Sequence, residues 1–413
     1  MSKPDKLQSA AEQLGPDGLS DLRSRAAKKF GATGFPTTRM EDWKYTDLSI
    51  ASDISVAALQ DFRTDLPPSY EIPDIDAHWL VISNGSPQVG SFSAIDGVEV
   101  SLLSEADVDL QFNLPLSDLN LALLSDGLRL TVDSGVNIDK PIGILFFDDA
   151  DTESLVSQGR VIIDVSKSAS VQVIEFHATR GDARKYANVF VDLNIGDNAR
   201  VDYARLQARD PSAVQTARLS VAAGRDATLR HFALDTGGKL VRNDLAIDIA
   251  QTGANVDFNG LYLADAMQHV DNHTRVDHRV GPAHSNQEYR GIVKGRAVWN
   301  GKAVVHEGAD GTDAQQANHN LLVAERAEIN AKPELEIYAE DVKCSHGTTV
   351  GQLDENAVFY LRTRCLDEEQ ARRLMTHAFA MGVAHRCPID ACTAWVDAHV
   401  DAALNALITE DAE

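Results

Sequence analysis

Cysteine and long apolar runs are both scarce in this sequence. The 413 residues contain four cysteines, and all lie in the last quarter of the chain: Cys344, Cys365, Cys387 and Cys392. Four thiols are too few for a fold built on disulfides. The longest apolar run, 142–147, falls far short of the roughly 20 residues of a membrane-spanning helix. Because no apolar signal core follows Met1 either, the expected compartment is a reducing cytosol.

Positive charge is also in short supply. The chain has 38 Lys and Arg residues against 62 Asp and Glu residues, a formal net charge of −24. A surface of this sign repels phosphate backbones and anionic lipid headgroups. We therefore expect no nucleic-acid partner and no membrane-surface role.

Three common catalytic loops are missing as well. The sequence has no Gly-x-Gly-x-x-Gly, no Gly-x-x-x-x-Gly-Lys followed by Ser or Thr, and no Gly-x-Ser-x-Gly. Such loops cradle phosphates or present a nucleophilic serine. Their absence removes the commonest nucleotide-binding and hydrolase interpretations.

The first part of the chain has helical spacing. The length predicts two or three domains or one elongated repeat architecture. Apolar residues recur at helical intervals from Leu19 to Phe30, with Asp17 or Ser20 placed to cap the start and Gly31 after the end. Prolines 67, 68 and 73 then predict a linker, segment 79–82 a short strand, and segment 117–125 a short helix.

A strand-like pattern replaces the helical one from about residue 128 to about residue 350. Segments 129–132, 161–165 and 189–193 read as strands, with turns rich in Gly, Asp, Asn and Ser between them. A weak repeat runs through this region: a polar turn, then alanine, any residue and an apolar residue. Its alanines are spaced by 30, 28, 27, 43 and 30 residues: Ala169, Ala199, Ala227, Ala254, Ala297 and Ala327.

This repeat predicts a β-solenoid. A small residue at a tight turn followed by an inward apolar residue suits a coil that buries its face on the next coil. The alternative is an ordinary sandwich whose turns resemble one another by chance. Helical spacing returns near the end, where Asp367 and Gln370 predict a capping box. The predicted division is therefore a helical or mixed N-terminal domain over 1–125, a β core over 126–352 and a helical domain over 353–413.

Four histidines crowd one stretch: His269, His273, His278 and His284. The first two are four residues apart, which on a helix would place both on one face as zinc ligands. However, Val270 stands where a zinc protease of that type has glutamate, and the surrounding sequence reads as strands. We interpret these residues as individually satisfied histidines rather than as a metal site.

Cys387 and Cys392, with His385 beside them and Cys365 as a fourth ligand, could form a metal clip. Their spacing is wider than that of zinc knuckles, and both flanks read as helices. Buried structural thiols are the favoured interpretation.

The segment 340–349 holds the most informative residues. Cys344 and His346 are two apart, so they share one face if the segment is a strand. A thiol beside an imidazole and Lys343 could have a lowered pKa and act as a nucleophile or metal ligand. The alternative is a last strand with a buried thiol and a turn histidine.

Several separated motifs resemble the SufB/SufD family of the SUF iron–sulfur cluster assembly system. Residues 336–347, Glu-Ile-Tyr-Ala-Glu-Asp-Val-Lys-Cys-Ser-His-Gly, carry the strongest likeness, which continues through 348–351 and 359–362. Residues 39–46, Arg-Met-Glu-Asp-Trp-Lys-Tyr-Thr, are similar to the family's N-terminal motif, and 285–291 to a stretch common to both members. The resemblance covers about 36–381 in the expected order.

The resemblance implies a right-handed parallel β-helix between helical terminal domains. It also implies a non-catalytic scaffold that pairs with SufB and binds the ATPase SufC, with a transient iron–sulfur cluster at the SufB junction and no tightly bound cofactor. His346 corresponds to the histidine implicated at that junction, as a candidate ligand of iron or cluster, and Cys344 to its neighbouring cysteine. The resemblance leaves open whether a flavin binds the complex.

Two differences favour the SufD type over the SufB type. Ile337 stands where SufB carries its cluster cysteine, and Cys-Ser-His-Gly over 344–347 replaces the SufB sequence His-Glu-Ala-Thr. A SufB-like paralogue, a metal-dependent enzyme and a self-associating structural β-helix remain as alternatives. The sequence does not decide whether the chain forms a homodimer in isolation.

Overall fold

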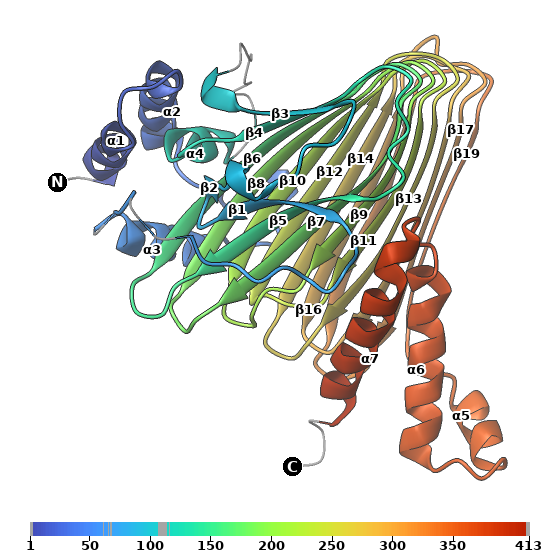
Figure 1. Ribbon diagram of the computed structural model, residues 1–413. Helices are drawn as coiled ribbons and strands as arrows, with labels where there is room; N and C mark the ends of the chain where they lie inside the picture. Colours follow the sequence, from blue (N-terminus) through green and yellow to red (C-terminus); the bar gives the residue numbers. More distant parts are fainter. Residues whose placement is uncertain are drawn as a thin grey trace.

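The computed structural model describes residues 3–409 except 61, 65, 67, 106–113 and 115, so Pro67 of the predicted linker lies outside it. The chain forms a parallel β-solenoid of about eight turns with helices toward both termini (Figure 1). This confirms the predicted fold class. No helix in the described ranges has the length and apolar character needed to cross a bilayer.

Two sheets form the walls of the solenoid. Sheet A has ten strands: β1 (His78–Ser83), β2 (Ser86–Pro87), β5 (Ile142–Asp149), β7 (Ser170–Arg180), β9 (Arg200–Gln207), β11 (Thr228–Asp235), β13 (Asn255–Ala264), β15 (His284–Val293), β17 (Asp313–Leu322) and β19 (Lys343–Gly351). Sheet B has nine: β3 (Val98–Leu102), β4 (Leu128–Val132), β6 (Leu155–Val165), β8 (Lys185–Ile195), β10 (Val214–Ala223), β12 (Leu240–Ile249), β14 (His269–His278), β16 (Arg296–Val305) and β18 (Glu328–Ile337).

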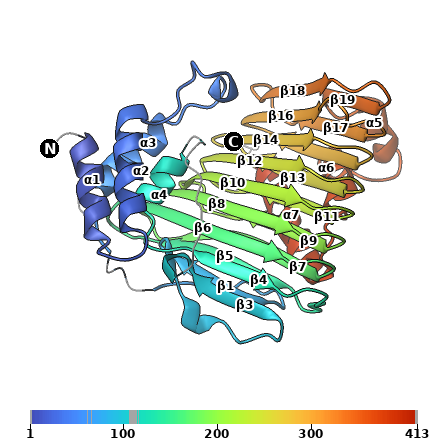
Figure 2. The same cartoon turned by 90° about the horizontal axis from the view of Figure 1, so that it is seen from above.

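The chain alternates between the sheets, so strands two apart in sequence pair in parallel. Antiparallel pairs occur only at the first end of the described solenoid, where β2 pairs with β1 and β3 with β4. Figure 2 shows the coils stacked from that end to β18 and β19 at the other. The domain division at residue 126 stays a prediction, although β1 and β3, which precede it, belong to the sheets.

The alanine repeat has a physical basis at the turns that enter sheet A. Residues 168, 198, 226 and 253 have positive φ, between 55° and 82°, and the alanine after each is at most 1% exposed. A left-handed residue turns the chain sharply, and only a small side chain fits under the next coil. The 43-residue spacing arises because Ala297 and Ala327 enter sheet B instead, at β16 and β18.

The helices lie outside the two sheets. They are α1 (Lys3–Gln13), α2 (Ser20–Thr33), α3 (Ser49–Ala58), α4 (Ser117–Ala122), α5 (Glu355–Arg362), α6 (Glu368–Ala384) and α7 (Thr393–Thr409), with single turns η1 (Glu41–Trp43), η2 (Val89–Ser91), η3 (Leu103–Glu105) and η4 (Asp390–Cys392). Helix α2 runs past the predicted stop at Gly31 and ends before Gly34, whose φ of 69° closes it.

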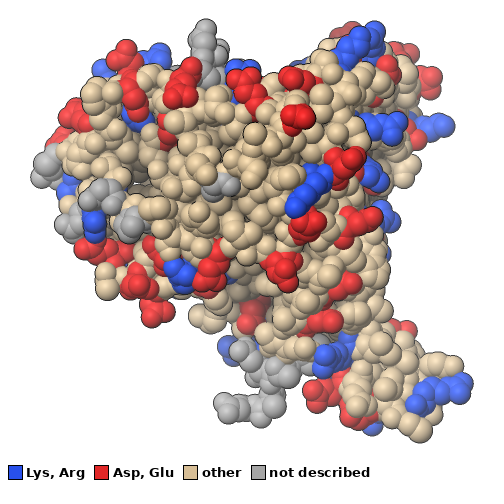
Figure 3. All heavy atoms as spheres, in the orientation of Figure 1, with Lys and Arg blue, Asp and Glu red and all other residues tan. Residues whose placement is uncertain are grey.

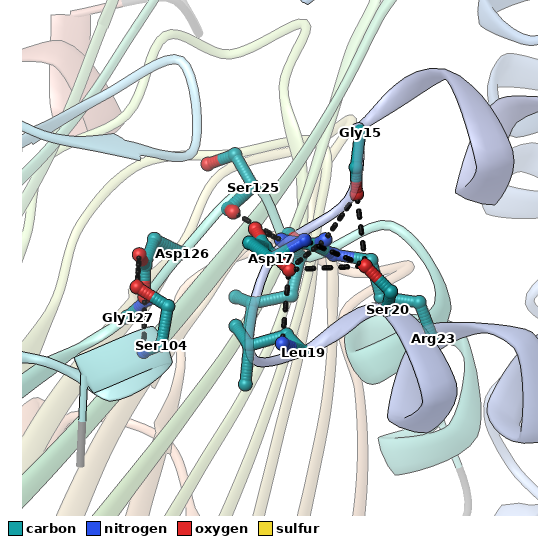
Figure 4. A network of polar contacts seen from close by, with 10 residues as sticks. Gly15, Asp17, Leu19, Ser20, Arg23, Ser104, Ser125, Asp126 and Gly127 are labelled. Carbon is teal, nitrogen blue, oxygen red and sulfur yellow. Dashed lines mark hydrogen bonds and ion pairs between the residues drawn. The ribbon is translucent and has the colours of Figure 1, made fainter.

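The N-terminal helices share one apolar core with the outer face of sheet B. Arg23 of α2 is buried, forms a two-pronged ion pair with Asp17, and donates to the carbonyl oxygen of Ser125 beyond α4 (Figure 4). Asp17 does not cap α2 directly, but it accepts a hydrogen bond from the backbone of Leu19. This network ties the first 30 residues to the start of the solenoid.

The C-terminal helices pack on sheet A. Helix α6 contacts β13 and β15, and Trp395 of α7 packs edge-on against Phe176 with ring centroids 4.9 Å apart. The predicted capping box of Asp367 and Gln370 is present at the start of α6. Figure 1 shows α5 at the far end of this hairpin, away from the strands.

Candidate functional site

The last coil leaves one end of the solenoid open. Strands β18 and β19 end their sheets, and no further strand of the described chain pairs with either. Large apolar side chains are exposed there: Ile337 at 42%, Tyr338 at 62% and Val350 at 50%. Unpaired strand edges offer backbone N–H and C=O groups to another chain.

Cys344 and His346 both lie on β19, so the prediction that they share one strand face is confirmed. Cys344 pairs in register with Ala314 of β17, and His346 pairs with Gln316. Both partners are buried in the interior of the preceding coil. Side chains at these two register positions form two columns, one residue from each coil, inside the solenoid. Both columns reach its open end, where Cys344 is half-buried and His346 is exposed.

The lumen under this site is polar rather than apolar. Asn318, two residues beyond Gln316 on β17, donates hydrogen bonds to the carbonyl oxygen of Tyr289 and to the hydroxyl of Tyr262, both at 3.2 Å. Thr348 of β19 donates to the Asn318 side chain at 3.4 Å. These residues were not predicted from the sequence, although the period of two that places Cys344 and His346 on one face also includes Thr348.

The imidazole of His346 makes no hydrogen bond or ion pair with other residues that the structure describes. Its ring nitrogens therefore stay open to a ligand from outside the chain. Neutral imidazole nitrogen is a common ligand of iron and other transition metals.

Of the two interpretations of Cys344, a thiol with a lowered pKa or a buried thiol, the structure favours the buried thiol. Burial raises the pKa of this thiol, a backbone hydrogen bond from Ala314 offsets the rise only in part, and the Asp313 carboxylate adds to it. Lys343, whose charge was expected to lower the pKa, is the adjacent residue of the strand and points to the opposite face. Cys344 alone is therefore not an activated nucleophile.

The histidine-rich stretch forms strands, and each histidine has its own partner. His269 contacts Thr46 at 3.0 Å, His273 contacts Asp271 at 3.1 Å, and His278 contacts Ser285 at 2.9 Å. His284 lies 4.0 Å from Asp313. No group of three or more His, Cys, Asp or Glu side chains is placed to hold a metal in the described ranges.

The four cysteines lie in three places. Cys365 follows α5, whereas Cys387 and Cys392 lie beyond the far end of α6. A helix of 17 residues is about 25 Å long. Cys365 is therefore too distant to complete a clip with Cys387 and Cys392.

The motif over 39–46 has a structural role that sequence analysis did not assign. Trp43 is 4% exposed and lies under the guanidinium of Arg242, which is 4.4 Å from the ring centroid. Arg242 also pairs with Asp271 at 2.6 Å, and Thr46 donates to the same carboxylate. Lys332 of β18 contacts Glu41 at 3.1 Å. The motif thus anchors the N-terminal segment across sheet B as far as the last coil.

Most of the chain matches two models of one protein family. Residues 147–379 match the family described as the SUF system FeS cluster assembly SufBD core domain, and residues 6–83 match the SufBD protein N-terminal region. The chain is 30% identical to the iron–sulfur cluster assembly protein SufD of Escherichia coli over 366 residues, which cover 84% of each chain. It is 28% identical to a SufBD family protein of Synechocystis over 416 residues, covering 93% of this chain and 92% of the relative. It is 26% identical to SufD of Bacillus subtilis, covering 91% of both. The chain therefore belongs to the SufBD family of the SUF iron–sulfur cluster assembly system.

Proposed function

We propose that this chain is a non-catalytic scaffold subunit of a SUF complex in a reducing cytosol. It pairs with a SufB homologue through the open end of the solenoid and holds a SufC-type ATPase. An iron–sulfur cluster is transient cargo at the junction with SufB, rather than a resident cofactor. His346 is a ligand of iron or of the nascent cluster, and Cys344 supports it.

One observation carries this proposal. The columns that end in Cys344 and His346 are buried in the preceding coils from β7 to β17, so a matching coil from a partner would cover them next. Such a partner would also bury Ile337 and Val350, which are exposed in the isolated chain. Burial of apolar area of this kind is the main favourable term in most protein association.

Exposed apolar side chains on the C-terminal helices support the proposed contact with the ATPase. Phe359 and Tyr360 of α5 are 67% and 58% exposed, and Leu374 of α6 is 49% exposed. Exposed aromatic residues grouped at the tip of a helical hairpin are typical of a protein-binding surface. Figure 3 shows both acidic and basic side chains on this face of the molecule.

Co-expression with the SufB and SufC homologues of the same source tests the proposal. We expect all three chains to co-purify and to elute together in gel filtration. Elution of this chain alone, or as a dimer of itself, in the presence of both homologues would contradict the pairing.

A further inference from the structure

Strand β19, which carries Cys344 and His346, has little apolar packing of its own. Every residue of β19 except Cys344 is exposed to solvent. A methyl group placed on Gly347 or Gly351 would meet no atom beyond the adjacent residues within 4 Å. A segment with so few buried contacts opens easily unless hydrogen bonds hold it. The side chains that bond to β19 therefore decide how well its position is fixed.

Two buried asparagines of β17 reach β19. Asn320 donates to the backbone carbonyl oxygen of Thr349 at 3.3 Å, and Asn318 accepts a hydrogen bond from Thr348 at 3.4 Å. Asn320 also donates to Asn318 at 2.6 Å, and the two are 4% and 0% exposed. An amide has different groups on its two sides. If Asn320 turned over, its oxygen would face the Thr349 carbonyl and the bond to β19 would be lost.

The hydroxyl of Tyr262 on β13 sets the orientation of both amides. It donates to Oδ1 of Asn320 and accepts from Nδ2 of Asn318, the latter at 3.2 Å. Because Oδ1 of Asn320 is held by this donor, its Nδ2 faces Asn318 and the carbonyl of β19. Tyr262 is 0% exposed, and a buried hydrogen bond left unmade is costly.

Tyr262 reaches β17 because the strand between them carries no side chain at that point. The register of sheet A places Tyr262, Gly291 of β15 and Asn320 in one column. A methyl group on Gly291 would overlap the tyrosine ring and would also lie 2.6 Å from Oδ1 of Asn320. Gly291 is therefore a site of close approach, which explains a glycine within a strand.

We propose that Tyr262 is a positioning residue for the open end of the solenoid. Through Asn318 and Asn320 it holds β19 in the place where a partner coil docks, and this inference rests on the proposed function. A strand that is ordered before the encounter lowers the conformational entropy lost on association. The buried tyrosine thus prepares a surface that it does not itself form.

Hydrogen–deuterium exchange of the isolated full chain tests the first step. Tyr262→Phe keeps the ring and removes the hydroxyl, so amides within 343–351 should exchange roughly tenfold faster, while those of β7 and β9 keep their rates. Gly291→Ala should give the same local effect by displacing the ring. Unchanged exchange of 343–351 in both variants would overturn the proposal.

Tyr186→Phe is the matched control. Tyr186 of β8 is also 0% exposed, and its hydroxyl contacts the Thr216 hydroxyl at 2.9 Å. In sheet B, β8 is separated from the last strand by β10, β12, β14 and β16. The variant therefore loses one buried hydroxyl, as Tyr262→Phe does, but should leave the exchange of 343–351 unchanged. Faster exchange of 343–351 in Tyr186→Phe as well would show a global loss of stability and overturn the assignment to Tyr262.

Association with the SufB homologue tests the second step. Titration calorimetry should show binding by Tyr262→Phe that is roughly tenfold weaker than binding by Tyr186→Phe. Equal binding by the two variants would overturn the positioning role, because a merely structural hydroxyl would affect both alike. If the wild type itself fails to bind, the proposed function is contradicted, and the exchange rates still decide whether Tyr262 holds β19.

Discussion

His346 of β19 stands in register with Gln316 of β17, so an exposed imidazole continues a column of side chains that is buried one coil earlier. Side chains that are interior in the earlier coils are therefore exposed at the last coil, where a partner could contact them. The interior is polar here, since Asn318 and Thr348 lie two residues further along the same strands and hydrogen-bond to each other. A partner coil placed there would enclose His346 and Cys344 together.

Replacement of His346 by alanine tests its role as a ligand. We expect His346→Ala to lower the yield of iron–sulfur cluster in the purified complex severalfold. Folding should stay intact, because a substitution at an exposed site usually changes the free energy of unfolding by only about 0.5 kcal/mol. Cluster absorbance per complex and the thermal midpoint measure the two effects.

Ser345→Ala is the matched control, because Ser345 directly precedes His346 on β19 and points to the opposite face. Its cluster yield should equal that of the wild type. Equal yields for His346→Ala and the wild type would exclude the ligand role.

The folded protein should become less stable as the pH falls, because a buried histidine must then take up a proton. Burial lowers the pKa of His278 to about 4. The unfolded chain binds the proton near the ordinary value of about 6.5, so stability is full above that pH and is lost as pH falls toward 4. The loss should approach about 3 kcal/mol, since each pKa unit is worth about 1.4 kcal/mol.

Thermal unfolding between pH 7 and pH 4.5 measures this effect. His278→Gln should flatten the decline, whereas His385→Gln, at an exposed position, should leave it unchanged. An equally steep decline in His278→Gln would show that other groups cause the pH dependence.

The N-terminal motif should contribute strongly to stability. Trp43→Ala removes a buried ring and the surface on which the Arg242 guanidinium lies. Loss of a buried aromatic side chain costs about 3–5 kcal/mol in the free energy of unfolding. Urea denaturation should show a shift of this size for Trp43→Ala and a much smaller one for Tyr45→Ala, which alters a partly exposed ring of the same motif. Similar shifts for the two variants would contradict the anchoring role.

The solenoid could be predicted because its turns repeat, but strand boundaries could not. Strand β6 begins at Leu155, six residues before the predicted segment at 161–165. Gln158 and Arg160 are polar yet buried, because α4 covers this part of the strand and Ser117 accepts a hydrogen bond from Arg160. A buried polar residue that hydrogen-bonds to a helix distant in the sequence interrupts the apolar pattern by which a strand is recognised.

The sequence predicted where the residues of the candidate site lie, but not the direction in which the pKa of the thiol shifts. The period of two correctly placed Cys344 and His346 on one face, whereas the pKa of Cys344 depends on its burial and on Ala314 and Asp313 of β17. The partner of Trp43 was also invisible in the sequence, since Arg242 is 199 positions further along the chain.

If a SufB homologue covers the open end of the solenoid, as proposed, a charge placed at that end should disrupt the complex. Val350 of β19 is 50% exposed at that end, and Val280, in a turn after β14, is 39% exposed. Burying an unpaired charge at an interface costs several kcal/mol, so Val350→Lys should weaken association by roughly a hundredfold or more. Gel filtration and titration calorimetry with the SufB homologue would measure this loss against Val280→Lys. Loss of the complex in Val350→Lys with normal binding in Val280→Lys is the predicted result, and equal binding by both variants would contradict this arrangement.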